Sequence, residues 1–251
     1  MAIALVSPQV NVLGSTSVSS INYAAPGTMG STHLDVVIFS ARNVANNPTV
    51  SIADDGTAFT RDLTGIADTN GNQHSDLHLW RHPAANTPGT VAVSWTGGAR
   101  LSVGVRLALL GVDLANPLDV KSASLAKGLA AANSGPFAAT VPGITTTTDN
   151  AIVIACLSAG QPLVGIAPNN APAVSGWTPI IGGCPLNATT SPIILAYYRI
   201  AGAAGPVPDL AVALTATGSN SNWVGAMAAY KADPSGGGVQ LNKVNFFGFP
   251  L

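Results

Sequence analysis

The sequence predicts an all-β fold, a jelly-roll-like antiparallel β-sandwich, from three observations. Apolar and β-branched residues come in short runs, separated by turn sequences such as Asn-Asn-Pro and Thr-Pro-Gly. The apolar period of an amphipathic helix is hard to find, and residues 122–133 are the one candidate for a helical turn or two. The runs also repeat in order along the 251 residues, which indicates an internal duplication.

The predicted strands are rich in Val, Ile, Leu and aromatic residues, which suit a pleated and half-buried surface. The clearest runs are residues 33–41, 49–53, 90–97 and 100–112.

Four segments recur in the same order at an offset of roughly 115 residues, far longer than a solenoid repeat of about 20 to 50. The matched pairs are 33–43 with 150–160, 57–63 with 175–181, 77–97 with 194–218, and 100–113 with 222–233. The predicted organisation is an N-terminal arm at 1–29, a duplicated sandwich at 30–233 with repeats at about 30–115 and 145–233, and a hinge and tail at 234–251. The repeats could form two tandem sandwiches or one larger sandwich with internal pseudo-symmetry.

The runs DVVIFSA, GTAFTRDL, LHLWRHPAANTPGTVAVSW and VRLALLGVDLANPLD, ending in a GVD-x-x-x-PL turn, set the strand pattern of this region. This pattern resembles a broad group of bacterial and tailed-phage β-sandwich domains of jelly-roll-like architecture, over about residues 30–233. Such domains occur in virion proteins and in surface modules. The resemblance therefore implies the fold more firmly than the task.

Charge is scarce in this chain. Charged residues make up 8% of the sequence, against about 25% in an ordinary soluble domain, glutamate is absent, and the net charge is −1. Such a chain has no basic field to attract nucleic acid or a membrane surface. No apolar run approaches the roughly 18 to 20 residues of a membrane span. The first residues also lack the pattern of a signal peptide, so we expect synthesis in a host cytoplasm without export.

Both ends of the chain are predicted to bind neighbours. After the glycine-rich hinge at 234–238 comes an apolar tail, and burying each of its aromatic rings could gain about 2 to 3 kcal/mol. We expect the tail to dock on a neighbouring subunit or on the parent fold, by strand addition. Its candidate anchor residues are Val239, Leu241, Val244, Phe246, Phe247, Phe249 and Leu251.

The stretch HSDLHLWRHP at 74–83 holds three of the four histidines. Strand alternation places Leu77 and Leu79 on one face and the residues at 74, 76, 78, 80 and 82 on the other. Asp76 and His78 are close enough to share one metal ion, but a third ligand has no clear source. We therefore expect a structural strand whose leucines face the core and whose histidines lie on the solvent side or rim.

Other candidate sites are weak. Residues 68–72 are better explained as a turn than as a calcium loop, and Cys156 and Cys184 are expected to be buried free thiols, with a disulfide as the alternative. The sequence shows no nucleophile elbow, phosphate loop or positioned carboxylate pair. No catalytic residue, metal or cofactor is expected, and an enzyme is not predicted.

The four tryptophans are expected to pack in the core or at its rim, with Trp80 and Trp177 as the candidates for glycan contact. The resulting hypothesis is a non-enzymatic structural protein of a tailed-phage or phage-like virion. It would be a head decoration protein or a spike or fibre subunit, and its partners would be its own copies and other virion proteins. The rival hypothesis is a module that binds a host surface glycan. A hydrolase, the third, lacks converging aspartates.

Overall fold

The computed structural model is all-β. It describes residues 3–24, 32–43, 50–54, 57–67, 74–83, 90–96, 100–129, 136–159, 171–183, 193–215 and 222–235. Within these ranges there is no helix, and the strands form antiparallel sheets. The predicted fold class is confirmed.

The described part of the first half contains nine strands, numbered in chain order. They are β1 (Ala4–Val18), β2 (Ser20–Tyr23), β3 (His33–Asn43), β4 (Val50–Asp54), β5 (Thr57–Ala58), β6 (Thr60–Ala67), β7 (His74–Pro83), β8 (Val91–Trp95) and β9 (Arg100–Leu110). One sheet has the order β1-β9-β3-β7-β6 and the other the order β2-β8-β4-β5. With β5 and β6 taken as one interrupted strand, this is the strand order of a jelly roll.

The second half repeats this arrangement. Its strands are β10 (Leu118–Lys121), β11 (Ala126–Leu129), β12 (Pro136–Val141), β13 (Thr145–Thr146), β14 (Ile152–Ala159), β15 (Thr178–Gly183), β16 (Ile193–Ile200), β17 (Gly205–Pro206), β18 (Leu210–Thr215) and β19 (Asn222–Tyr230). The main sheet has the order β10-β19-β14-β16-β15, with β11 also paired to β19, and β12 pairs with β18. The strands β9, β3, β7 and β6 thus correspond to β19, β14, β16 and β15.

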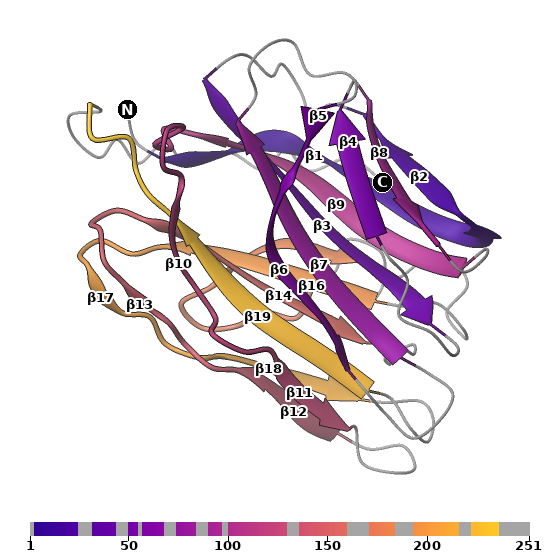
Figure 1. Cartoon of the computed structure of the whole chain (residues 1–251). Coiled ribbons are helices and arrows are strands. Elements are labelled where there is room, and N and C mark those ends of the chain that lie inside the picture. Colours follow the sequence, from indigo (N-terminus) through magenta and orange to yellow (C-terminus); the bar gives the residue numbers. More distant parts are fainter. Residues whose placement is uncertain are drawn as a thin grey trace, which may run out of the picture.

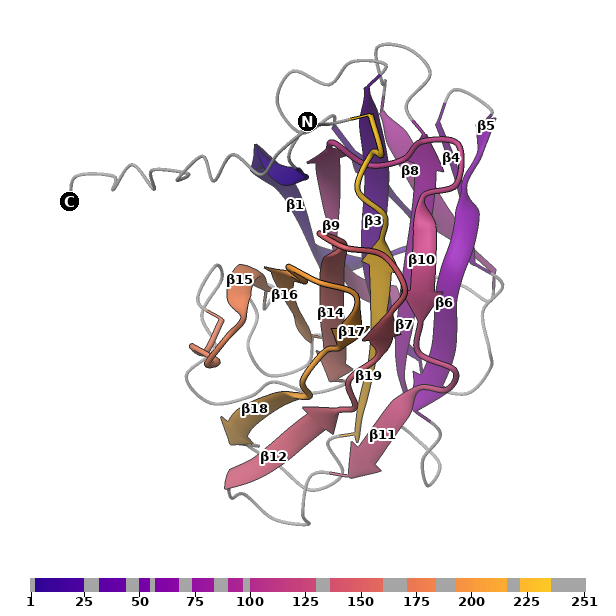
Figure 2. The ribbon, with the colours of Figure 1, turned by 90° about the vertical axis from the view of Figure 1, so that its left-hand side faces the viewer.

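The two halves lie main sheet against main sheet (Figure 1), so the molecule has four layers (Figure 2). One apolar core fills each half between its own two sheets, and a third lies between the two main sheets. Of the two arrangements that the sequence left open, the structure shows two sandwiches stacked face to face.

Burial along the strands follows from this layering. Every residue of β14 is buried, because the strand lies in a main sheet that is covered on both faces. The outer strand β8 instead alternates between buried and exposed residues, because only one of its faces is covered. The continuous apolar runs in the sequence are therefore the central strands, and the alternating runs are the outer ones.

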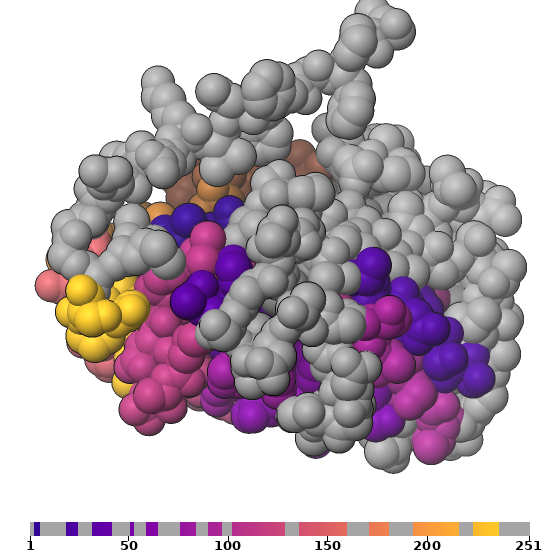
Figure 3. Space-filling model, turned by 90° about the horizontal axis from the view of Figure 1, so that it is seen from above, coloured from indigo at the N-terminus to yellow at the C-terminus, as the bar shows by residue number. Residues whose placement is uncertain are grey.

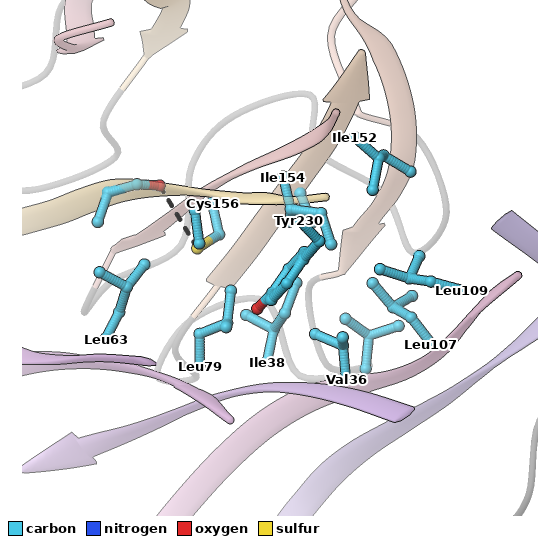
Figure 4. Packing of buried hydrophobic residues seen from close by; sticks show 14 of the residues in the cluster. Val36, Ile38, Leu63, Leu79, Leu107, Leu109, Ile152, Ile154, Cys156 and Tyr230 are labelled. Carbon is cyan, nitrogen blue, oxygen red and sulfur yellow. Dashed lines mark hydrogen bonds between the residues drawn. The ribbon is translucent and has the colours of Figure 1, made fainter. Parts of the chain in front are cut away.

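The central core joins equivalent strands of the two halves. Figure 4 shows Val36 and Ile38 of β3 on one side and Ile154 and Cys156 of β14 on the other. The pairing registers make Val36 equivalent to Ile154 and Ser40 to Ser158.

Equivalent residues meet across this core. The hydroxyls of Ser40 and Ser158 are 2.6 Å apart and share a buried hydrogen bond. Strand contacts are also reciprocal. β19 contacts β6 and β7, and its counterpart β9 contacts β15 and β16, which are the counterparts of β6 and β7. The interface has the pattern of a two-fold symmetric dimer contained within one chain.

The N-terminal segment requires a correction. Residues 1–29 were expected to form an arm that reaches neighbouring subunits. Instead, β1 pairs with β9 and β2 pairs with β8, so residues 4–23 lie within the two sheets of the first half. Two jelly-roll sheets each need these strands, which leaves no long arm among the described N-terminal residues.

The possible helical turn at 122–133 is also corrected where the structure describes it. Residues 126–129 form β11, which pairs with β19 from Ala126↔Gly225 to Leu129↔Asn222. Gly128 suits this position because a Cβ there would collide with the Trp223 indole. Pairing with a buried strand outweighs the helical preference of the alanines.

The last described residues lie beside the segment that follows β9. The Asp233 amide donates to the Gly111 carbonyl at 2.8 Å, and Val112 pairs with Ala232. Figure 3 shows this end in yellow beside magenta residues of that segment. The chain therefore reaches residue 235 next to the end of β9.

Candidate functional site

The histidine-containing strand β7 is buried on both faces. Leu77 and Leu79 belong to the central core between the halves, on the face that alternation predicted. On the other face, Asp76 is 0% exposed and His78 is 4% exposed. The expectation of a solvent-side or rim position is therefore wrong for His78, because the outer sheet of the first half covers it. His82 is half-buried, and the His74 side chain lies outside the described residues.

Asp76, His78 and Thr64 form a short polar chain at this position. Thr64 Oγ1 lies 3.0 Å from His78 Nδ1, and His78 Nε2 lies 3.4 Å from Asp76 Oδ2. The Ala41 amide donates to the other carboxylate oxygen. The imidazole stacks on the Trp80 ring with centroids 5.1 Å apart. This packing holds the imidazole inside the outer core. Among the described residues, Asp76 Oδ2 and His78 Nε2 are buried without a hydrogen-bond partner, so their mutual approach is only a weak electrostatic contact.

Among its described side chains, β7 does not gather a metal-ligand set. Across the described part of the chain, no group of three or more His, Cys, Asp and Glu side chains could hold a metal ion. Asp76 and His78 supply two ligands, as the sequence analysis expected, and structural zinc sites use four.

A second buried polar pair lies in the same outer core. The Arg106 guanidinium donates from Nε and Nη2 to the Asp35 carboxylate, with Nη2 to Oδ2 at 2.6 Å. Arg106 Nη1 also donates to the Tyr23 carbonyl at 3.1 Å. Both side chains are almost completely buried. The two-pronged geometry compensates the desolvation of the two charges.

The tryptophans do not provide a platform for sugar rings. Trp80 is 3% exposed and Trp177 is 6% exposed, and Trp95 and Trp223 are also buried. Trp177 donates to the Asp209 carbonyl at 3.3 Å, and the Arg199 guanidinium lies over its ring. Glycan stacking needs an exposed ring face, so the structure offers no support for glycan contact at Trp80 or Trp177.

A polar cluster joins the two halves at one side of the central core. Asp62 of β6 accepts from Arg81 Nε at 2.9 Å and from the Tyr230 hydroxyl at 3.0 Å. Lys121 of β10 donates to the Asp62 carbonyl at 2.6 Å. We call Asp62, Arg81, Lys121 and Tyr230 the polar clasp. It ties β6 and β7 of the first half to β10 and β19 of the second.

Burial governs the titration of the clasp. Burial raises the pKa of the Asp62 carboxyl, and the nearby Arg81 guanidinium partly opposes this shift. Burial also raises the pKa of the Tyr230 hydroxyl well above its ordinary value, and the neighbouring Asp62 carboxylate adds to the rise. Tyr230 therefore stays protonated and acts as a hydrogen-bond donor.

The clasp is not among the sites predicted from the sequence, although the repeat contains a signal for it. The segment TRDL at 60–63 aligns with TPII at 178–181. Asp62 thus occupies a position where the other repeat has Ile180. A carboxylate in an apolar position of a repeat indicates a buried partner.

The remaining predicted sites are placed only in part. Cys156 is a free, buried thiol whose pKa is raised to about 12 by burial, and it donates to the Ala226 carbonyl. Cys184, the turn at 68–72 and all tail anchors from Val239 to Leu251 lie outside the described residues.

Comparisons with known proteins returned nothing, since no protein-family model, curated protein or solved structure matches this chain. In the described part of the chain, no helix is long and apolar enough to cross a membrane.

Proposed function

We propose that this chain is a non-enzymatic structural subunit of a tailed-phage or phage-like virion, either a head decoration protein or a spike or fibre subunit. The observation that carries the proposal is the character of the two outer faces. Described side chains exposed on the outermost strands are small and uncharged. On β2, β4 and β8 they are Ser20, Asn22, Ser51, Ala92 and Ser94, and on β12 and β18 they are Pro136, Ala138, Thr140, Ala211 and Ala213.

Some of the few charged side chains are buried inside the fold. Asp35, Asp62, Asp76 and Arg106 are buried, although the sequence has only ten basic and eleven acidic residues. Four of the twenty-one charged side chains are therefore withdrawn from the surface. Such a surface has little electrostatic repulsion to keep copies apart. Outer faces whose described exposed side chains are small and uncharged support a role in close packing with copies of itself and other virion proteins.

The experiment is to measure the mass of the native complex, with the full chain and with residues 239–251 deleted. We expect the full chain to form a defined oligomer and the deletion to reduce its order, because the apolar tail supplies adhesive area. A full chain that stays monomeric at high concentration would contradict the proposal. Circular dichroism and unfolding of the shortened chain serve as the control for folding.

A further inference from the structure

The polar clasp has a symmetry-related counterpart on the other side of the central core. Asp62 lies at the register shift between Arg61 and Leu63, where β6 pairs with β7. Ile180 lies at the matching register shift between Pro179 and Ile181, where β15 pairs with β16.

The other members of the clasp correspond in the same way. Val36 pairs with Arg81, and its equivalent Ile154 pairs with Tyr198. Leu34 pairs with Leu109, and its equivalent Ile152 pairs with Tyr230. The positions of Asp62, Arg81 and Tyr230 are thus occupied by Ile180, Tyr198 and Leu109 on the second side.

The counterpart is apolar and partly open. Leu5, Ile180, Tyr198 and Ile200 pack against the central core, and each is half-buried. Leu5 pairs with Leu109, which is fully buried beneath them. We call Leu5, Leu109, Ile180, Tyr198 and Ile200 the apolar seam. The clasp consists of charged side chains and a tyrosine hydroxyl. The seam instead presents mainly apolar surface, whose burial would be favourable.

The chain itself supplies a matching cover. Asp233 is hydrogen-bonded to Gly111, two residues beyond Leu109 and next to Leu110, which pairs with Ala4 at the start of β1. Residues 236–251 therefore begin at the end of the seam. At about 3.3 Å per residue, a fully extended chain of this length can span roughly 50 Å, which matches the 15-residue edge strand β1.

We propose that the apolar seam is the docking site of the tail, residues 239–251, with the rings of Phe246, Phe247 and Phe249 covering Ile180 and Tyr198. This inference rests on the proposed function, because it names where the adhesive tail is held. A free chain holds its own tail, since the covalent link through residues 234–238 gives the tail a high effective concentration at the seam. In the assembly, neighbouring copies exchange identical tails.

The test uses a fluorescent synthetic peptide of residues 236–251 and measures its anisotropy with the chain shortened at residue 238. We expect the peptide to bind the shortened chain. Binding should weaken at least about tenfold for Ile180→Asp, because a charge then enters the covered surface. A peptide with all three phenylalanines changed to serine should also bind at least about tenfold more weakly.

The matched control is Ala213→Asp, which adds the same charge at an exposed position on β18; it should bind the peptide as the unsubstituted shortened chain does. Tyr198→Ser is a second seam variant in case Ile180→Asp unfolds. The full-length chain should bind the added peptide at least about tenfold more weakly than the shortened chain, because its seam is already covered.

Three results would overturn the inference: no binding to the shortened chain, binding that both seam variants leave intact, or equal binding to the full-length chain. Its failure is distinguishable from failure of the proposed function. If deleting the tail reduces the mass of the oligomer but the seam variants do not weaken peptide binding, only the inference is contradicted. If the full chain stays monomeric but the seam of the shortened chain binds the peptide, only the proposed function is contradicted.

Discussion

The two jelly rolls share one strand order, but their interiors differ in chemistry. In the first half, the buried Arg106–Asp35 ion pair lies between the two sheets. The pairing registers make Arg106 equivalent to Met227 and Asp35 equivalent to Val153, which are both in the apolar core of the second half.

The same contrast holds on the neighbouring strands. Asp76 and His78 correspond to Ile193 and Leu195, and Tyr23 corresponds to Val141. The topology is therefore compatible with either a polar or an apolar interior. The buried charges of the first half are not required for the jelly roll itself, and removing one partner of a pair should be far worse than removing both.

The largest expected effect breaks the ion pair. Arg106→Met should lower the free energy of unfolding by about 3 to 5 kcal/mol, because Asp35 is left charged and buried. The double variant Arg106→Met, Asp35→Val installs the residues of the second half and should recover most of this loss. Urea unfolding measures both. A double variant as unstable as the single one would show that the two interiors are not interchangeable.

A smaller effect separates two equivalent glycines. A Cβ at Gly104 would collide with the Tyr23 hydroxyl and lie 2.8 Å from the Ile38 carbonyl, whereas at the equivalent Gly225 it would meet the Val141 side chain. Overpacking of this kind costs about 1 to 3 kcal/mol. Gly104→Ala should fall in the upper part of that range and Gly225→Ala in the lower part, because a backbone carbonyl adapts less than a methyl group.

The control for both glycines is Gly202→Ala, whose Cβ would meet nothing within 4 Å. Thermal and urea unfolding of the three variants should rank them in this order. A Gly225→Ala cost that equals or exceeds that of Gly104→Ala would contradict the argument that the Ile38 carbonyl adapts less than the Val141 side chain.

A third prediction compares the clasp with the seam through pH. Burial raises the pKa of Asp62 above its ordinary value of 3.8. Between the ordinary pKa and the raised pKa, the folded chain therefore keeps a proton that the unfolded chain loses. The contribution of Asp62 to stability is thus fully present below the ordinary pKa and is lost as pH rises through the folded pKa.

Asp62→Asn should therefore make the fall in unfolding free energy with rising pH less steep. Urea titrations measure this from about pH 3 upward, the pH at which carboxyl groups of the unfolded chain begin to lose their protons. The difference between the two proteins isolates Asp62 from other carboxyls. An unchanged slope would mean that the folded and unfolded pKa values of Asp62 are equal. The equivalent Ile180 carries no titratable group.

The smallest expected effect lies on an outer face. The hydroxyls of Ser51 and Ser94 are 2.9 Å apart and exposed. Ser94→Ala should change the unfolding free energy by less than about 0.5 kcal/mol, as is usual for surface positions. Calorimetry can check this value, and a cost near that of a core substitution would show that the face is covered in solution.

Sequence reasoning succeeded where a period or a repeat specifies the answer. Alternation placed Leu77 and Leu79 in a core. The match of TAFTRDL with SGWTPII identified β6 and β15 as equivalent strands of the two repeats. It failed where tertiary contacts decide. A polar strand face at Asp76 and His78 has the same alternation whether water or another sheet covers it. The Ser- and Asn-rich N-terminal residues likewise resemble a loose arm until β9 and β8 pair with them.

The most direct test of the face-to-face arrangement of equivalent halves uses Ser40 and Ser158, whose hydroxyls are 2.6 Å apart across the central core. The double variant Ser40→Cys, Ser158→Cys should form an intramolecular disulfide on oxidation, because the two Oγ atoms that the sulfurs would replace are 2.6 Å apart, close to an S–S bond of about 2.05 Å. Peptide mapping under non-reducing conditions should recover the linked pair. Free thiols at both positions in the folded, oxidised protein would contradict the arrangement.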